Sequence, residues 1–336
     1  MNKKVLIIAN YQKSVGGISV QVDLLHKYLS NEDGYYAEIY SLKGSIIKRI
    51  LLIIKLFVVA RHYDVLHIHA CSDRGFLPAV VGAYVGRLYK KRLILTYHGG
   101  GAGAFFARKS KFVRKIFSKI DKVIVLSEYL KRIFDVYDMP CVVIPNIVEF
   151  NAQLFVKKAN IQPKFISVRH LRELYNIPCI LKAFEIVKKK IPTATLTILG
   201  DGDQRTNLEN WVIEHKLEDV SFIGAVPHDK MNEYLQQNDI FLSAPRTDNM
   251  PMSILEAYNA GLLVISSNVG GVPYMLNDNE TGLLFESENA DDLAEKMIHS
   301  IQNQQHTIEM IQDAYQSLDM YKWENIKNKL FEAYNK

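Results

Sequence analysis

Short apolar runs rich in β-branched residues alternate along the chain with longer stretches whose apolar positions recur at helical spacing. Buried parallel strands and the amphipathic helices that connect them give this pattern. The runs that predict strands are 4–10, 36–42, 64–69, 92–98, 122–127 and 141–146, and then 165–168, 194–200, 220–224, 240–245, 263–268 and 282–285. Helices are expected between them, for example at 176–190 and 252–260. Each half of the chain therefore predicts a Rossmann-like α/β domain.

The segment 149–164 has no sustained period of either kind, which indicates a linker between two domains. A chain of 336 residues is also longer than one hydrophobic core usually serves. We expect a first domain at 1–150, a second at 165–317, and a last helix at 318–336 that packs back on the first. Open α/β sheets bind ligands beyond the carboxyl ends of their strands. The chemistry is therefore expected in strand-end loops, where the two sheets face one another across a cleft.

Charge is divided unequally between the two halves. Residues 1–150 carry 23 Lys and Arg against 11 Asp and Glu, whereas residues 151–336 carry 18 against 25. A basic half indicates an anionic partner, which is nucleic acid, a membrane surface or a phosphorylated substrate. Nucleic acid is disfavoured because no aromatic platform or known recognition motif accompanies the charge.

Two stretches of the first half bear on a membrane partner. The segment 105–120 has six basic residues, no acidic ones and one apolar helical face, which favours a helix lying on an anionic bilayer over a core helix. The segment 45–61 is strongly apolar but too short to span a bilayer, and we interpret it as mainly core, with membrane contact as the alternative. The N-terminal apolar run is too short for a secretory signal, and the three cysteines lack metal or disulfide spacing. We expect a cytoplasmic protein, peripheral on the inner face of the cell membrane.

Two strand-end loops of the first half carry candidate chemistry. Gly16 and Gly17 precede a helix whose free N–H groups suit phosphate, although a glycine pair is also a plain tight turn. His98 precedes three glycines that offer no side chain to bury it, which favours an exposed active-site histidine over a core one.

Two loops of the second half carry the remaining candidates. Arg169 and Arg172 follow the first strand, where a guanidinium fork suits a diphosphate, although a solvated basic loop fits nearly as well. Asp248 and Glu256 are eight residues apart, one in a loop and one on the following helix, and they can accept hydrogen bonds from sugar or ribose hydroxyls. The N–H groups around Met252 and Ser253 can hold phosphate, and helix capping by Asp248 is the alternative.

Two patterns that suggest a metal are disfavoured. Asp201 and Asp203 lie in a turn after a predicted strand, and His67 and His69 alternate on a buried strand, where packing is the commoner role. We expect no metal site and no cofactor.

Ten motifs in order resemble the retaining glycosyltransferases of family four, and the resemblance spans almost the whole chain. They read GGISVQVDLL, DVLHIHA, TYHGG, VIVLSEYL, VIPN, ISVRHL, TILGDGD, VSFIGAVPHDKM, DNMPMSILEA and GGVPYML. The DNMP and RxLxxLYN elements are similar to a variant within that family. The resemblance implies a GT-B fold, a nucleotide-sugar donor held mostly by the second domain, and no required metal.

The resemblance also implies roles for the candidates. Gly16 and Gly17 match a loop near the donor phosphates, and His98 matches a histidine near the transferred sugar. Asp248 matches an acid on the sugar hydroxyls and Glu256 one on the ribose, while 224–230 matches the nucleobase pocket. Other residues implied in donor binding are Val226, Asn249, Met250, Pro251, Met252 and Ser253.

One element departs from the family pattern. Two positions that supply an Arg and a Lys to the diphosphate in the family align here with His170 and Tyr175. Arg169 is displaced by one position from the family's Arg, and it is favoured over Arg172 as the cation. The expected activity is transfer of a hexose, from a UDP-sugar as first guess, to a saccharide or lipid-linked saccharide in surface polysaccharide synthesis. The alternatives are a non-catalytic subunit that binds nucleotide sugar and a GT-B epimerase.

Overall fold

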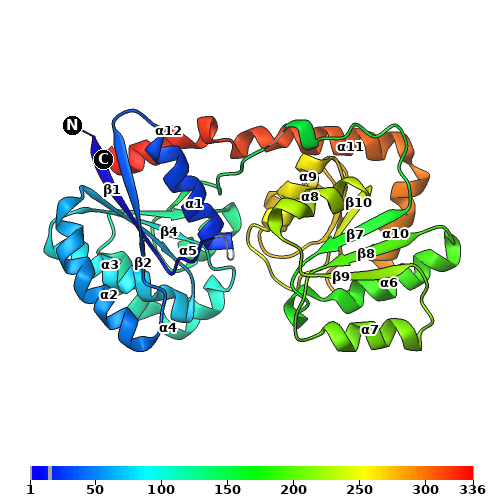
Figure 1. Ribbon diagram of the computed structural model, residues 1–336, viewed down its shortest axis with the longest axis horizontal. Coiled ribbons are helices and arrows are strands. Elements are labelled where there is room, and N and C mark those ends of the chain that lie inside the picture. The colour runs from blue at the N-terminus through cyan, green and yellow to red at the C-terminus, as the bar shows by residue number, and fades with distance from the viewer. Residues whose placement is uncertain (1, 14–16, 151, 336) are drawn as a thin grey trace. The chain divides into compact units, whose positions relative to one another are not determined.

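A computed structural model describes residues 2–13, 17–150 and 152–335 (Figure 1). The chain divides into two compact α/β units. The first unit takes Met1–Glu149 together with Met320–Lys336, and the second unit takes Phe150–Asp319. The first unit is therefore discontinuous in sequence, because its last helix follows the whole of the second unit.

The first unit is built on a parallel sheet of six strands in the order β2-β1-β3-β4-β5-β6. In register, Ile7 of β1 lies between Ile39 of β2 and His67 of β3. The central strands are buried along nearly their whole length, as expected of a parallel sheet covered on both faces. The strands are β1 (Lys3–Ala9), β2 (Tyr35–Ser41), β3 (Val65–Ala70), β4 (Arg92–Tyr97), β5 (Lys122–Val125) and β6 (Val142–Val143).

Helices cover both faces of this sheet (Figure 1). Because side chains alternate along a strand, Leu93 and Leu95 of β4 join the core on one face and Ile94 joins the core on the other. The first face packs against α2 (Ile46–Val59), α3 (Leu77–Leu88), α4 (Ala102–Phe117) and α5 (Glu128–Val136). The second face packs against α1 (Gly17–Ser30) and α12 (Trp323–Asn335).

The second unit repeats the plan with a parallel sheet in the order β12-β11-β10-β7-β8-β9. Its strands are β7 (Lys164–Val168), β8 (Thr195–Leu199), β9 (Val220–Gly224), β10 (Ile240–Ser243), β11 (Leu263–Ser267) and β12 (Leu283–Phe285). Its helices are α6 (Ile177–Lys190), α7 (Arg205–Glu214), α8 (His228–Gln236), α9 (Met252–Ala260), α10 (Ala290–Gln302) and α11 (Gln304–Ser317). A single apolar cluster joins strands of this sheet to α6, α10 and α11.

Each expected strand is present, and one is much shorter than expected. The run 141–146 forms only the two-residue β6, which lies between Pro140 and Pro145. Proline has no N–H to donate to a neighbouring strand, so these two residues limit the pairing on either side.

Two expectations about apolar helices are wrong. The apolar face of α4 does not lie on the surface: Phe105, Phe106, Val113, Ile116 and Phe117 are buried in an aromatic core with Phe76, Tyr97 and Phe134. The segment 45–61, in contrast, is not mainly core. Among the residues of α2 only Leu56 is fully buried, because only one side of the helix rests on the unit.

Candidate functional site

His98 directly follows β4, at the carboxyl end of the first sheet. Its backbone N–H donates to the carbonyl of Ala70, 2.8 Å away at the end of β3. The next residue has to be small, because a Cβ atom on Gly99 would lie 2.9 Å from the hydroxyls of Ser72 and Tyr97. Register and close packing therefore fix the position from which the His98 side chain projects.

The imidazole of His98 is held by a second histidine. Its Nε2 atom lies 2.9 Å from Nδ1 of His69, which is buried on β3. Burial lowers the pKa of His98 to about 4 and that of His69 well below its ordinary value. Both rings are therefore neutral at pH 7, and one proton lies between them. His98 is half-buried rather than fully exposed as expected, because the ring of His69 covers it from the neighbouring strand.

His67 continues this buried polar group behind His69. Its two ring nitrogens each lie 2.8 Å from a hydroxyl, Nε2 from Thr96 and Nδ1 from Tyr334 of α12. Burial lowers the pKa of His67 to about 3. A cavity of about 40 Å³ beside these side chains has room for water rather than for a sugar. Across the described residues, no three histidine, cysteine or acidic side chains are grouped to hold a metal ion.

The glycine loop before α1 is described only in part. Gly16 lies outside the described residues, and Gly17 is the first residue of α1. A Cβ atom on Gly17 would meet no atom of the described residues within 4 Å.

In the second unit the structure brings together Arg169, just after β7, and Asp248, in the loop between β10 and α9. Nη2 of Arg169 lies 3.0 Å from Oδ2 of Asp248, and the guanidinium stands 5.1 Å from the ring centre of Tyr175. The Arg169 side chain is only 13% exposed. Its Nε and Nη2 atoms are buried with no well-oriented hydrogen-bond acceptor among the described residues. The guanidinium is thus held in place with Nε unused and with Nη2 paired only to the carboxylate of Asp248 within the described chain.

Two glycine pairs support these loops, and their part was not predicted. A Cβ atom on Gly200 would lie 1.8 Å from the carbonyl oxygen of Arg169, and one on Gly271 would lie 1.7 Å from that of Asn249. The N–H of Gly271 also donates to the carbonyl of Asp248. The LGDG and GGVP motifs therefore serve backbone packing behind the candidate site. The sequence shows these glycines after predicted strands, but it does not show which backbone segments pack against them.

The remaining donor-binding candidates lie around the start of α9 and in nearby loops. Asn249, Met250 and Pro251 are buried in the loop before α9, and Ser253 lies in its first turn with a buried hydroxyl that lacks a hydrogen-bond partner in the described chain. Three further candidates are half-buried, namely Val226 after β9 and Met252 and Glu256 on α9. Arg172 is exposed and directly precedes a short 3₁₀ helix (Glu173–Tyr175), and no contact joins its side chain to the Arg169–Asp248 pair among the described residues.

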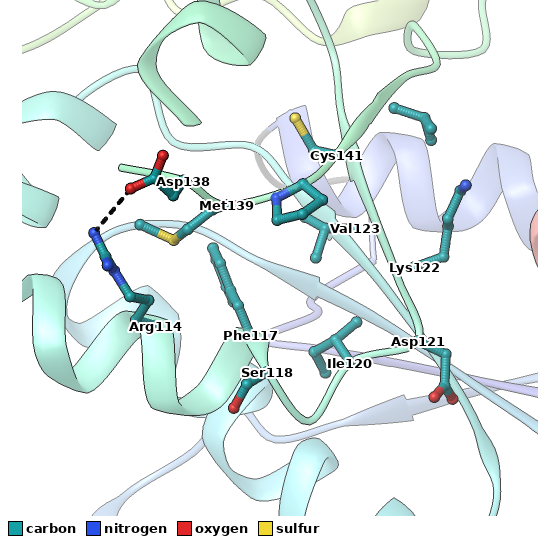
Figure 2. Close-up of a pocket in the computed structure, with 12 residues that line it drawn as sticks. Arg114, Phe117, Ser118, Ile120, Asp121, Lys122, Val123, Asp138, Met139 and Cys141 are labelled. Carbon is teal, nitrogen blue, oxygen red and sulfur yellow. Dashed lines mark ion pairs between the residues drawn. The ribbon is translucent and has the colours of Figure 1, made fainter. Parts of the chain in front are cut away.

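A pocket of about 410 Å³ lies elsewhere in the first unit (Figure 2). It is lined by the end of α4, where Phe117 and Ser118 lie, by the loop Asp138–Cys141, and by the first residues of β5. These are the amino ends of the strands, opposite the end that carries His98. Ligands of open α/β sheets bind at the carboxyl ends, so we do not assign this pocket to the site.

Two family matches and a solved structure agree with this architecture. Residues 33–151 match glycosyltransferase family 4, and residues 151–317 match glycosyl transferases group 1. HepE of Anabaena, solved with UDP and glucose, is similar over 98% of this chain and 99% of its own, with a TM-score of 0.78 at 17% identity. The chain belongs to the GT-B glycosyltransferases. The predicted GT-B fold of two Rossmann-like domains is confirmed.

Two curated relatives of this glycosyltransferase match over part of their length. One phosphatidylinositol N-acetylglucosaminyltransferase subunit, from Arabidopsis thaliana, is 31% identical over 142 residues, which are 40% of this chain and 31% of the relative. The amylovoran biosynthesis glycosyltransferase AmsK of Erwinia amylovora is 29% identical over 171 residues, which are 48% of this chain and 42% of the relative. Each match thus spans less than half of the relative. Within the described residues, no helix of the glycosyltransferase is long and apolar enough to cross a bilayer.

Proposed function

We propose that this protein transfers a hexose from a UDP-sugar to a saccharide or lipid-linked saccharide, with retention of configuration and without a metal ion. The second unit would bind the donor and the first unit the acceptor. The names of two relatives support a nucleotide-sugar donor and a lipid acceptor, since HepE was solved with UDP and glucose and the Arabidopsis protein is named for phosphatidylinositol.

The observation that carries the proposal is the guanidinium of Arg169. It is nearly buried, is oriented by Asp248 and Tyr175, and keeps Nε and Nη2 without a well-oriented acceptor in the described chain. A buried donor without an acceptor costs about 1 to 3 kcal/mol, which a bound anion would recover. A diphosphate fits, because its oxygens match the fork of a guanidinium.

The chemistry needs charge stabilisation more than an enzymic nucleophile. The bond between the sugar C1 and the phosphate oxygen breaks, the acceptor oxygen bonds to C1 on the same face, and its proton passes to the departing phosphate. Negative charge grows on the nucleoside diphosphate, where Arg169 and the N–H groups at the start of α9 would stabilise it. Asp248 would then accept hydrogen bonds from the sugar hydroxyls.

The nucleoside would be held by neighbouring groups. Glu256 in the second turn of α9 would accept the ribose hydroxyls, and the loop after β9 with Val226 would face the base. In the first unit, His98 would contact the transferred sugar as a neutral imidazole, since its pKa is lowered to about 4.

Calorimetric titration with UDP and with uridine tests these roles separately. Arg169→Gln should weaken UDP binding about tenfold or more and leave uridine binding unchanged, because only UDP carries the diphosphate. Glu256→Gln should weaken both ligands, because both carry the ribose. The matched control is Lys189→Gln, which removes an exposed charge from α6 of the same unit.

Three results would contradict the proposal. Equal UDP affinity in the wild type and in Arg169→Gln would remove the diphosphate from this site. UDP binding without slow hydrolysis of any nucleotide sugar would favour a non-catalytic role, and formation of an epimerised donor without acceptor would favour an epimerase.

A further inference from the structure

The outward side of α2 is apolar and has no cover in the described chain. Its inward residues rest on the core through Leu52, Ile53, Leu56 and Val59. Ile47 is 75% exposed and Leu51 is 61% exposed. The exposed apolar side chains of α2 are Ile46, Ile47, Ile50, Leu51, Ile54, Phe57 and Val58. A helix with apolar side chains on nearly every side is normally enclosed, but α2 is covered by its own unit on one side only.

Exposed apolar side chains also occur on the next two helices of the same layer. Figure 1 shows α2, α3 and α4 on one side of the first sheet, and α3 contacts both of its neighbours. Tyr84 and Leu88 of α3 and Phe112 of α4 are also exposed. Separately placed apolar side chains are ordinary on a protein surface, but seven exposed ones on the single helix α2 mark an interaction site.

The helices of this surface carry basic residues and no acidic ones, although acids of the adjoining loops pair with two of their arginines, Arg87 with Asp121 and Arg108 with Asp73. No Asp or Glu occurs in 39–63 or in 74–120, a span that includes all of α2, α3 and α4. Lys48 and Lys55 are exposed on α2, and three further lysines, Lys109, Lys111 and Lys115, are exposed on α4. Lys119 lies over the ring of Tyr84, 5.1 Å from its centre, so cations adjoin the apolar side chains directly.

We propose that this outer face of α2, α3 and α4 docks on an anionic lipid surface, with α2 lying in the interfacial layer. Apolar insertion and attraction of lysines to anionic headgroups act together at such a surface. A second copy of the chain fits less well, because it would bring two cationic faces together with no acidic residue of these helices to pair them. This inference deepens the proposed function. It rests on that function in one respect, namely that a docked first unit would reach a lipid-linked acceptor at the membrane surface.

The face assigned here differs from the one expected from sequence. The apolar side chains of α4 point into the core, so α4 would contribute cations and Phe112, and α2 would contribute the inserted surface. Docking does not use the Arg169–Asp248 pair, which belongs to the second unit.

Flotation with vesicles of phosphatidylglycerol in phosphatidylcholine tests the proposal. The wild-type protein should float with these vesicles, less so as salt rises, and should not float with pure phosphatidylcholine. The double variant Ile47→Ser/Ile54→Ser should lose about tenfold or more in vesicle affinity, because both side chains are exposed and would enter the lipid. Lys111→Gln/Lys115→Gln should lose roughly tenfold at low salt.

The control is Val136→Ser/Ile213→Ser, which removes two equally exposed apolar side chains from α5 and α7. It should float like the wild type. Equal vesicle binding by the wild type and the α2 variant would overturn the proposal. Failure of the wild-type protein to float would also overturn it. If sedimentation velocity showed a dimer, and Ile47→Ser/Ile54→Ser dissociated that dimer, the face would be assigned to a second copy of the chain. UDP titration of each variant checks the donor site independently. Loss of vesicle binding with unchanged UDP affinity would concern docking alone, whereas loss of UDP binding would concern the proposed function.

Discussion

Nδ1 of His69 lies 2.9 Å from Nε2 of His98, and the two rings stack with centroids 5.1 Å apart. His69 is buried on β3, whereas His98 follows β4, so parallel strand pairing sets the geometry of the histidine pair. Because both pKa values are lowered by burial, one neutral ring donates and the other accepts. His69 thereby holds the ring orientation of His98 and couples the tautomers of the two rings.

We predict that His69 acts as a positioning residue for His98. His98→Ala should lower the rate of donor hydrolysis about tenfold or more. His69→Ala should lower it less, and His69→Asn should recover part of the loss because an amide can still bond to the ring. Steady-state kinetics should show the change in kcat, with UDP affinity unaltered. A His69→Ala protein with normal kcat would show that His98 needs no such support.

We predict that acid weakens the first unit before it weakens the second. Unfolded histidine binds a proton near pH 6.5, whereas His98 and His67 bind one only near pKa values of about 4 and 3. Between pH 6.5 and 4 the unfolded state holds more protons, so the free energy of unfolding falls as the pH falls, by at most about 1.4 kcal/mol per pH unit for each histidine.

The two tryptophans allow the measurement, since Trp323 lies in the first unit and Trp211 in the second. Urea unfolding of Trp211→Phe should show a lower midpoint at pH 5 than at pH 7. Trp323→Phe reports on the second unit, where His170, His215, His299 and His306 are exposed, and its midpoint should change less. Equal changes in both variants would rule out the buried histidines as the cause.

We predict that Gly271→Ala displaces the loop that carries Asp248. The added Cβ atom would stand 1.7 Å from the carbonyl oxygen of Asn249, a backbone atom that cannot move alone. UDP affinity should fall about tenfold or more, because the N–H groups at the start of α9 would shift with the loop. Gly103→Ala is the control, since its Cβ atom would meet nothing within 4 Å. Unchanged UDP affinity in Gly271→Ala would separate this loop from the nucleotide.

The periodic pattern predicted the strands because a buried parallel strand is apolar along its whole length. Such a strand can be recognised from its own sequence without knowledge of its neighbours. What limited β6 was also visible in sequence, as Pro140 and Pro145. The environment of a helix face was not visible. The periods of α2 and α4 show that both carry apolar sides, but protein core and lipid select the same side chains, so only packing tells them apart.

The candidate site was predictable to a similar degree. Sequence placed Arg169 and Asp248 in strand-end loops, yet their contact depends on β7 and β10 being neighbours in the sheet. His98 was taken as exposed because its sequence neighbours are glycines, whereas the ring beside it comes from His69, 29 positions earlier. The glycines at 200 and 271 are visible in the sequence, but the backbone segments that approach them are known only from the structure.

The helix α12 determines the order in which the two units can complete their cores. Its residues Trp323, Ile326, Leu330 and Tyr334 close one side of the first core, and the hydroxyl of Tyr334 reaches His67. They are made after every residue of the second unit. The second unit is therefore synthesised in full before the first unit can close, and His67, which the hydroxyl of Tyr334 contacts, is enclosed last.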